Sequence, residues 1–215
     1  MKTTLKLASV LFFASLVFAC SVKEEEEQTR DYSNDSFYYY GYEDRIIQVE
    51  IVMDKILIKF SSDTNKEQIL ALISGADSLT LISRAYWYEG PLRYAALESK
   101  DGKQISQETL TSLKKRDEIM SVTYMHRYNG KLSGIMDDFC VKLKGSTSYE
   151  QLKKLAEKNG CKIGGRDSFV NNQYTLYVPK TSELNAMQMA NKFYETKLFA
   201  FAEANFIVLN AIQQP

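Results

Sequence analysis

The chain has 215 residues, of which 27 are basic, 27 are acidic and 45% are hydrophobic. This length suits one domain or two small ones, and the hydrophobic fraction is large enough for a core. Because the formal net charge is zero, the surface gives no electrostatic reason to expect nucleic-acid binding.

The start of the chain, residues 1–19, has the three parts of a secretory signal. Lys2 and Lys6 are basic, residues 7–17 are apolar, and a small residue directly precedes Cys20. The apolar run is shorter than the roughly 20 residues that a membrane-spanning helix needs. This arrangement resembles the bacterial lipobox, which implies a lipoprotein that is anchored to a membrane through diacylated Cys20. An ordinary secretory signal that happens to contain a cysteine is the alternative.

Residues 20–44 are predicted to be an acidic and tyrosine-rich linker. Glu24 to Glu27 form a block of like charge, which favours an extended chain. The block resembles the acidic tags of surface-exported lipoproteins of the Bacteroidetes, which implies an outer-membrane lipoprotein exposed at the cell surface. A plain spacer is the alternative. The aromatic run at 37–42 is expected to pack against the first sheet, with a platform for a glycan or a nucleic base as the alternative.

Two segments of the chain are similar to each other. Residues 53–72 and 136–155 align without a gap, and Met, Asp, Lys, Thr, Glu, Gln and Leu are identical at matching positions. In each segment a strand pattern leads to Thr-x-x-Glu, which predicts a capping box before an amphipathic helix. The predicted boxes are Thr64 with Glu67 and Thr147 with Glu150. This repetition indicates an internal duplication, with predicted domains at 45–128 and 129–215.

The first unit is predicted to have the order strand, helix, strand, strand, helix, strand. Its expected elements are a strand at 55–60, a helix at 65–74, strands at 79–87 and 92–98 joined by a turn at 88–91, a helix at 107–116 and a strand at 118–125. Ser106 is the expected N-cap of the second helix, and Ile105 is expected to pack against Leu110 as a hydrophobic staple. Residues 46–52 are expected to add an edge strand, and Asn129-Gly130 to mark the domain boundary.

The second unit is predicted to repeat this order. Its expected elements are a strand at 139–144, a helix at 148–158 closed by Asn159-Gly160, strands at 161–168 and 173–178 joined at Asn171-Asn172, a helix at 183–196 and a strand at 200–209. Apolar residues lie on one face of each helix: Leu152, Leu155 and Ala156 in the first, and Ala186, Met189, Ala190, Phe193 and Tyr194 in the second. The predicted fold is therefore α+β, with two tandem ferredoxin-like βαββαβ units.

Few residues of the kinds that carry catalysis or bind metals are present. His126 is the single histidine, and it is expected to be a surface or boundary side chain at a strand end. Cys140 and Cys161 are expected to remain free thiols. In the predicted topology a third strand separates them by about 9.5 Å, whereas a disulfide spans at most roughly 7 Å between Cα atoms. No residues have the spacing of metal ligands.

The remaining polar motifs favour structural roles. Asp137-Asp138 is expected to form a turn that leads into a strand, and the aligned Asp54 supports that interpretation. Gly164-Gly165 lies inside a predicted strand and indicates a bulge rather than a phosphate-binding loop. No nucleophile elbow, P-loop or dinucleotide fingerprint is present. We therefore expect a protein that is not an enzyme and that needs no cofactor.

Several motifs follow one another in a recognisable order. They are the acidic lipoprotein start, SFYYYGYEDRI, KILIKF before KEQIL, DEIMSVTYMHRYNGK, FCVKLK before YEQLKKLAEKNG, and AMQMANKFYETKLFAFAEANF. Over residues 36–208 this order resembles the N-terminal prodomain region of subtilisin-like serine proteases from Bacteroidetes. One departure is Ala204, because the family usually has proline there, and its loss removes a stiff exit from the last strand.

The resemblance implies an inhibitor or folding chaperone of a subtilisin-like protease. Its open sheet face would pack on the protease, and its C-terminal segment would enter the active-site cleft as an added strand. Because the chain stops at Pro215, we expect no catalytic domain on it and action in trans. The residues expected to contact the protease are Glu203, Asn205, Leu209 and Ala211. Two alternatives are a surface lipoprotein that binds a glycan or protein without any protease link, and a truncated protease remnant.

Overall fold

The computed structural model describes residues 38–41, 44–87 and 93–209. These residues form strands and helices in the order β1 (Tyr38–Tyr40), β2 (Ile46–Gln48), β3 (Glu50–Phe60), α1 (Lys66–Ser74), β4 (Leu79–Trp87), β5 (Tyr94–Ser99), α2 (Gln107–Lys114), β6 (Ile119–Tyr128), β7 (Lys131–Leu143), α3 (Tyr149–Lys158), β8 (Lys162–Arg166), β9 (Gln173–Tyr177), α4 (Ala186–Glu195) and β10 (Phe199–Leu209). The predicted α+β class is confirmed. The turn expected at 88–91 lies outside the described residues.

Eight of these strands form one sheet, in which all the described pairings are antiparallel. The strand order is β4-β5-β3-β6-β7-β9-β8, and β10 pairs with β7. One edge of β7 therefore carries β10, while the other edge carries first β6 and then β9. β1 and β2 form a separate two-stranded sheet.

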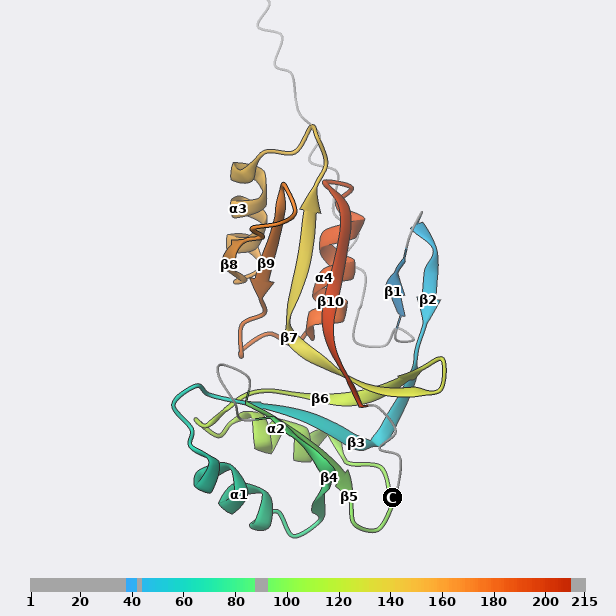
Figure 1. Cartoon of the computed structure of the whole chain (residues 1–215), viewed down its shortest axis with the longest axis vertical. Coiled ribbons are helices and arrows are strands. Elements are labelled where there is room, and N and C mark those ends of the chain that lie inside the picture. Colours follow the sequence, from blue (N-terminus) through green and yellow to red (C-terminus); the bar gives the residue numbers. More distant parts are fainter. Residues whose placement is uncertain (1–37, 42–43, 88–92, 210–215) are drawn as a thin grey trace, which may run out of the picture. The chain divides into compact units, whose positions relative to one another are not determined.

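The elements from β3 to β6, here called the first repeat, and those from β7 to β10, the second repeat, have the same order along the chain. Their strands also have matching spatial orders, β4-β5-β3-β6 and β8-β9-β7-β10. In each repeat two helices cover one face of the strands (Figure 1). A two-residue hairpin turn joins the repeats. Its residues Asn129 and Gly130 have φ angles of 48° and 75°, in the left-handed region that asparagine and glycine tolerate.

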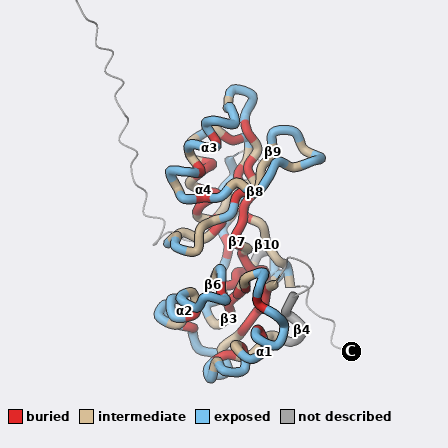
Figure 2. Tube along the Cα trace, turned by 90° about the vertical axis from the view of Figure 1, so that its left-hand side faces the viewer, coloured by how far each residue is buried: buried red, intermediate tan, exposed pale blue. Residues whose placement is uncertain are grey.

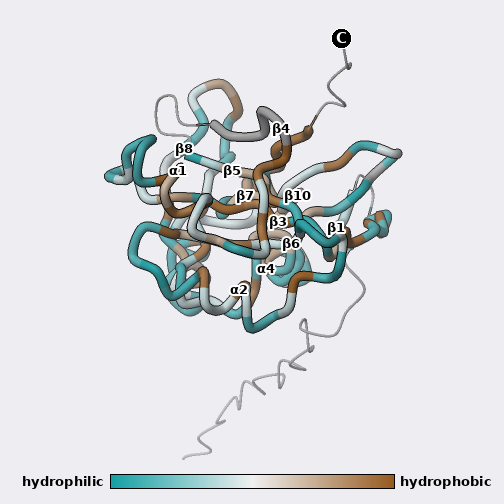
Figure 3. The backbone as a smooth tube through the Cα atoms, turned by 90° about the horizontal axis from the view of Figure 1, so that it is seen from below, coloured by the Kyte–Doolittle hydropathy of each residue, from teal (hydrophilic) through white to brown (hydrophobic). Residues whose placement is uncertain are grey.

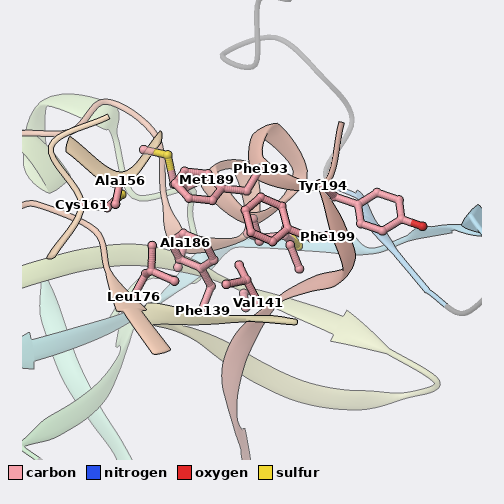
Figure 4. Close-up of a cluster of buried hydrophobic side chains, with 14 of the residues drawn as sticks. Phe139, Val141, Ala156, Cys161, Leu176, Ala186, Met189, Phe193, Tyr194 and Phe199 are labelled. Atoms are coloured by element: carbon pink, nitrogen blue, oxygen red, sulfur yellow. The ribbon is translucent and has the colours of Figure 1, made fainter. Parts of the chain in front are cut away.

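Each repeat has a hydrophobic core between its strands and its helices. In the first repeat Ile58 of β3 packs in one cluster with Ile69 of α1 and Leu110 of α2. In the second repeat Phe139 and Phe193 are fully buried, and their rings meet edge to face with centroids 5.0 Å apart (Figure 4). The predicted apolar faces of α3 and α4 are confirmed, because these residues are buried or partly buried in that core. Figure 2 shows buried residues along the strands and exposed ones on the outer sides of the helices.

Each of the four described helices begins with an N-cap side chain that accepts a hydrogen bond from a backbone N–H of the first turn. In α1 the box is Asn65 with Gln68, and in α3 it is Ser148 with Gln151. The predicted Thr-x-x-Glu boxes are therefore wrong by one residue. The predicted N-cap of α2, Ser106, is confirmed by its bond from the Thr109 N–H.

The two threonines of the predicted boxes have a different and shared role. Thr64 donates a hydrogen bond to the carbonyl of Glu118 at 3.5 Å, and Thr147 donates one to the carbonyl of Leu198 at 2.6 Å. Each accepting carbonyl directly precedes the last strand of its repeat. Each threonine thus ties the start of a helix to the start of a distant strand, which sequence-local reasoning about caps does not include.

The residues expected to form an extra edge strand divide between two elements. Residues 46–48 form β2, whereas residues 50–52 begin β3 and pair with β6 inside the main sheet. The edge-strand prediction is therefore wrong for the second of these segments. The predicted bulge at Gly164-Gly165 is confirmed, because the pairing of β8 with β9 shifts register between Ile163 and Gly165.

The described part of the aromatic run packs on the second repeat, so the expectation that it covers the first sheet is wrong. The hydroxyls of Tyr38 and Tyr40 donate to Glu195 at 3.1 and 2.8 Å. The side-chain amide of Asn191 donates to the backbone carbonyl of Tyr38 at 2.7 Å, and Tyr194 donates its hydroxyl to Asp44. β1 is therefore fastened to α4, which lies about 150 positions later in the chain.

Candidate functional site

A β-bulge inside β7 positions the two aspartates that the sequence singled out. The pairing of β7 with β10 shifts register between Ala204 and Phe206, opposite the segment that holds Asp137 and Asp138. The pairing of β3 with β6 shifts at the aligned place, around Asp54. Extra residues at a bulge twist the strand and redirect its side chains. The prediction of a turn before the strand is wrong, because both aspartates lie within β7.

Asp137 links the two repeats. The Lys59 ammonium donates to both of its carboxylate oxygens, at 2.5 and 2.6 Å, and the Tyr94 hydroxyl donates to it at 3.0 Å. The same ammonium lies 5.7 Å from the centroid of the Tyr94 ring and 5.4 Å from that of Tyr177. Burial, followed by the charge of Asp137, raises the pKa of Tyr94, so its hydroxyl stays protonated and remains a donor.

Asp138 has a different environment. Its side chain is 6% exposed, and one carboxylate oxygen accepts a hydrogen bond from the Asn205 amide at 2.6 Å. The other oxygen, Oδ1, is buried without a hydrogen-bond partner. Burial raises the pKa of Asp138, because the charged form loses solvation that a single amide does not replace. Two adjacent carboxylates are therefore held in opposite electrostatic surroundings.

A difference between the repeats explains this arrangement. The position of Asp138 is occupied in the first repeat by Lys55, whose ammonium binds Asp54 at 2.8 Å and Glu98 at 2.9 Å. The lysine next to the bulge aspartate is therefore local in the first repeat. The second repeat has no lysine at the position that corresponds to Lys55. The carboxylate of Asp137 is neutralised instead by Lys59 of the first repeat.

The second repeat has one sheet face without a helix, here called the helix-free face. Cys140 lies opposite Thr175 of β9 and Glu203 of β10 in the ladder, while Phe139 and Val141, its neighbours in the chain, point into the core. Side chains alternate along a strand, so the face is read from every second position. Its members are Asp138, Cys140, Lys142, Gln173, Thr175, Tyr177, Phe201 and Glu203.

The structure places three of the four residues that were expected to contact a protease. Glu203 is exposed on the helix-free face, and Asn205 bonds to Asp138. Leu209 pairs with Leu132 at the end of β10 and packs in a small apolar cluster of the first repeat. Figure 3 shows this hydrophobic end of β10 leading towards the C-terminus. Ala211 lies outside the described residues, and the role of all four in binding stays a prediction.

His126 is buried, so the expectation of a surface or boundary side chain is wrong. It is 3% exposed, and its ring meets that of Phe206 edge to face at a centroid distance of 5.0 Å. Its Nδ1 has no hydrogen-bond partner, and burial lowers its pKa to about 4. The imidazole is therefore neutral at physiological pH and serves as part of the packing between β6 and β10.

Both described cysteines are free thiols, as expected. Cys140 is partly exposed on the helix-free face, whereas Cys161 is 8% exposed and burial raises its pKa to about 11. Within the described ranges no three His, Cys, Asp or Glu side chains gather closely enough to hold a metal ion. Nor does any helix in those ranges have the length and apolarity needed to cross a membrane. Cys20 and the signal segment lie outside the described residues.

Sequence reasoning missed the link between Lys59, Tyr94 and Asp137. These residues are far apart in the chain and meet only because the two repeats share one sheet. One signal was available in the two aligned segments. Both have an aspartate at the same position, Asp54 and Asp137, but the lysine that follows it in the first segment, Lys55, is replaced by Asp138 in the second. The second segment therefore lacks a local cation for its aspartate. Neither a scan against protein-family models nor a search of curated proteins gives a match to this chain.

Proposed function

We propose that both repeats are ferredoxin-like units and that the chain is a subtilase-prodomain-like inhibitor, or folding chaperone, of a subtilisin-like protease. The order βαββαβ and the matching strand orders of the two repeats support the first part. The second part rests on the order of sequence motifs together with the surface of the second repeat.

The observation that carries the proposal is the helix-free face, to which β10 contributes Phe201 and Glu203. Two helices cover one side of the second repeat, and the other side presents Lys142, Thr175 and Glu203 without a helix over them. Tyr177 and Phe201 lie on this face among mostly polar side chains, and aromatic residues are enriched where proteins pack against one another. β10, which forms one side of this face, leads directly to the segment that would enter the protease cleft.

β10 itself also defines which residues are free to bind. Its residues 206–209 pair with β7, so their backbone groups on that side are already used. The segment proposed to add a strand to the protease is therefore the one after Leu209. The outer edge of β10 is a second possible place for strand pairing. It has no partner strand within the described ranges, so its backbone groups on that side could pair with a strand of the protease.

The proposal is tested by titrating purified residues 20–215, carrying Cys20→Ser, against extracellular subtilases of the same organism. We expect saturable inhibition. Thr175→Arg places a long charged side chain on the helix-free face and should weaken inhibition by at least about tenfold. Deleting residues 210–215 leaves β10 intact and should also weaken inhibition, because the tail provides the strand-like contacts.

The matched control is Lys154→Glu, which changes an exposed residue of α3 on the opposite side of the same repeat. It should leave inhibition unchanged. Absence of inhibition with every co-expressed subtilase would contradict the proposal. Equal inhibition by the wild type and Thr175→Arg would show that binding does not use the helix-free face.

The location at the outer membrane is part of the same proposal. A lipid on Cys20, followed by the acidic segment, would tether the folded repeats at the cell surface. A tether raises the local concentration of an inhibitor near proteases that are displayed on the same membrane.

A further inference from the structure

A cleft of about 490 Å³ lies in the first repeat, between α1 and β4. It is on a different repeat from the helix-free face. Leu70, Ala71 and Ile73 of α1 form one wall, and Leu79 and Leu81 of β4 form the other. Lys100, which follows β5, stands at the cleft with its side chain exposed. Ser74 of α1 and Thr80 of β4 also line the cleft. Its walls therefore combine apolar side chains with two hydroxyls, and a cation lies beside them.

The duplicated sequence supplies an internal comparison for this cleft. The positions of Leu70 and Ala71 in α1 correspond to Lys153 and Lys154 in α3. All four residues are exposed, and Leu70 has 41% of its surface accessible. A helix in this place therefore tolerates two lysines, which are the expected choice for a solvated position. The first repeat instead has an apolar pair there, and neither residue belongs to a hydrophobic cluster of the described ranges.

β4 adds hydrogen-bonding groups to the cleft. It is the outermost strand of its sheet, and only β5 pairs with it among the described elements. The Lys100 N–H donates to the Ser78 carbonyl at 3.0 Å, so the alternation of an antiparallel ladder directs the backbone of Leu81 and the carbonyl of Leu79 to the outer edge. The N–H of Leu79 is already bonded to Ala76. An extended chain is the ligand whose backbone satisfies such an edge.

Lys100 specifies the charge of that ligand. Its ammonium takes part in no ion pair within the described ranges, whereas the neighbouring Lys103 pairs with Asp101 at 3.0 Å. A carboxylate on the ligand would supply the missing partner. We propose that this cleft binds a short extended peptide with apolar side chains at alternate positions and a carboxylate near Lys100. The peptide adds a strand to β4 and places its apolar side chains against Leu70 and Leu81.

The probe for the test is a synthetic pool of random hexapeptides with free C-terminal carboxylates, incubated with residues 20–215 carrying Cys20→Ser. Retained peptides are identified by mass spectrometry after gel filtration. We expect the wild type to retain peptides with alternating apolar residues. Leu70→Lys with Ala71→Lys recreates the α3 sequence and should reduce retention about tenfold, since it removes apolar contact worth one buried leucine.

Two further variants make the result specific. Glu67→Lys alters an exposed residue of the same helix outside the cleft and should retain peptides like the wild type. Lys100→Gln should lower retention of the free acids by up to about fivefold and leave an amidated pool unaffected, as expected for one exposed ion pair. Circular dichroism verifies that each variant is folded.

The proposal is overturned if the wild type retains no peptides, or if it and the double-lysine variant retain the same amount. Protease inhibition is measured on the same double-lysine variant. Because the cleft and the helix-free face lie on different repeats, inhibition should be unchanged, and failure of one proposal is distinguished from failure of the other.

Discussion

At the residue scale, the ion pair between Asp137 and Lys59 is a direct side-chain contact between the two repeats. Both side chains are largely buried, with 9% and 18% of their surfaces exposed. A buried ion pair gives little net stability over an apolar pair, but removing one partner leaves an uncompensated charge. We therefore infer that the main role of the pair is to specify how β7 lies against β3 and β5.

We predict that Asp137→Asn lowers the free energy of unfolding by roughly 3–5 kcal/mol, because the Lys59 ammonium then stays buried without a carboxylate. Urea denaturation measures this loss. The control is Asp101→Asn, which removes the exposed partner of Lys103 and should cost much less. Similar losses for the two variants would show that the contact between the repeats contributes no more than a surface ion pair.

The buried histidine makes stability depend on pH. The folded-state pKa of His126 is about 4, compared with an ordinary value of 6.5. Since the unfolded chain takes up the proton more readily, the stabilisation is fully present above pH 6.5 and is lost as the pH falls towards 4. We predict that, between pH 6.5 and pH 4, the unfolding free energy of His126→Gln falls by about 3 kcal/mol less than that of the wild type. Unfolding free energies of both proteins across this range give the answer, and parallel pH profiles would contradict it.

At the element scale, the sequence predicted the helices of the second repeat and its strands β8, β9 and β10 closely, because their apolar periodicity coincides with real burial. Met189 and Phe193 of α4, for example, are 3% and 0% exposed. The prediction for β7 was wrong at its start, because the strand begins at Lys131 rather than at residue 139. The helix starts were less determined. Thr147 and Ser148 are both good N-cap residues with a suitable partner three residues later. The hydroxyl of Thr147 binds the carbonyl of Leu198, just before β10, and Ser148 is therefore the N-cap. Local sequence does not show this distant carbonyl.

The core of the second repeat gives a direct test at this scale. Phe193 is fully buried between Phe139 and Phe199, so Phe193→Ala should lower the free energy of unfolding by roughly 3–5 kcal/mol. Phe169 is 96% exposed in the loop between β8 and β9, and the same substitution there should change it by less than about 0.5 kcal/mol. Equal effects, measured by chemical denaturation, would show that α4 does not pack as described.

At the scale of the whole molecule, contacts between distant segments are what the sequence did not reveal. Tyr38 and Tyr40 of β1 pack on Glu195 of the second repeat, and Asp137 of the second repeat packs on Lys59 of the first. Both contacts depend on which distant segments the fold brings together. Periodicity reports only whether a side chain is buried, and not against what. The sequence singled out Asp137-Asp138 but assigned the pair to a turn, while the binding role of Glu203, which came from the resemblance, stays a prediction.

Attachment to the membrane is a separate property of the whole chain. We predict that Cys20→Ser, expressed in the native organism, moves the protein from the detergent phase to the aqueous phase in phase partitioning, because an acyl chain adds about 0.8 kcal/mol per buried methylene. The wild type and Ser21→Ala, which keeps the cysteine, serve as controls. If the serine variant still partitions with detergent, the lipoprotein proposal fails.

The most direct test of the proposed function uses a thiol that the chain already has. Cys140 is partly exposed on the helix-free face, while Cys161 is buried with a raised pKa and serves as an internal control. In residues 20–215 with Cys20→Ser, the rate of maleimide labelling is measured with and without a subtilase whose catalytic serine is replaced by alanine. The account predicts that saturating protease strongly slows labelling of Cys140 and that Cys161 stays unlabelled throughout. An unchanged rate at Cys140 would contradict it.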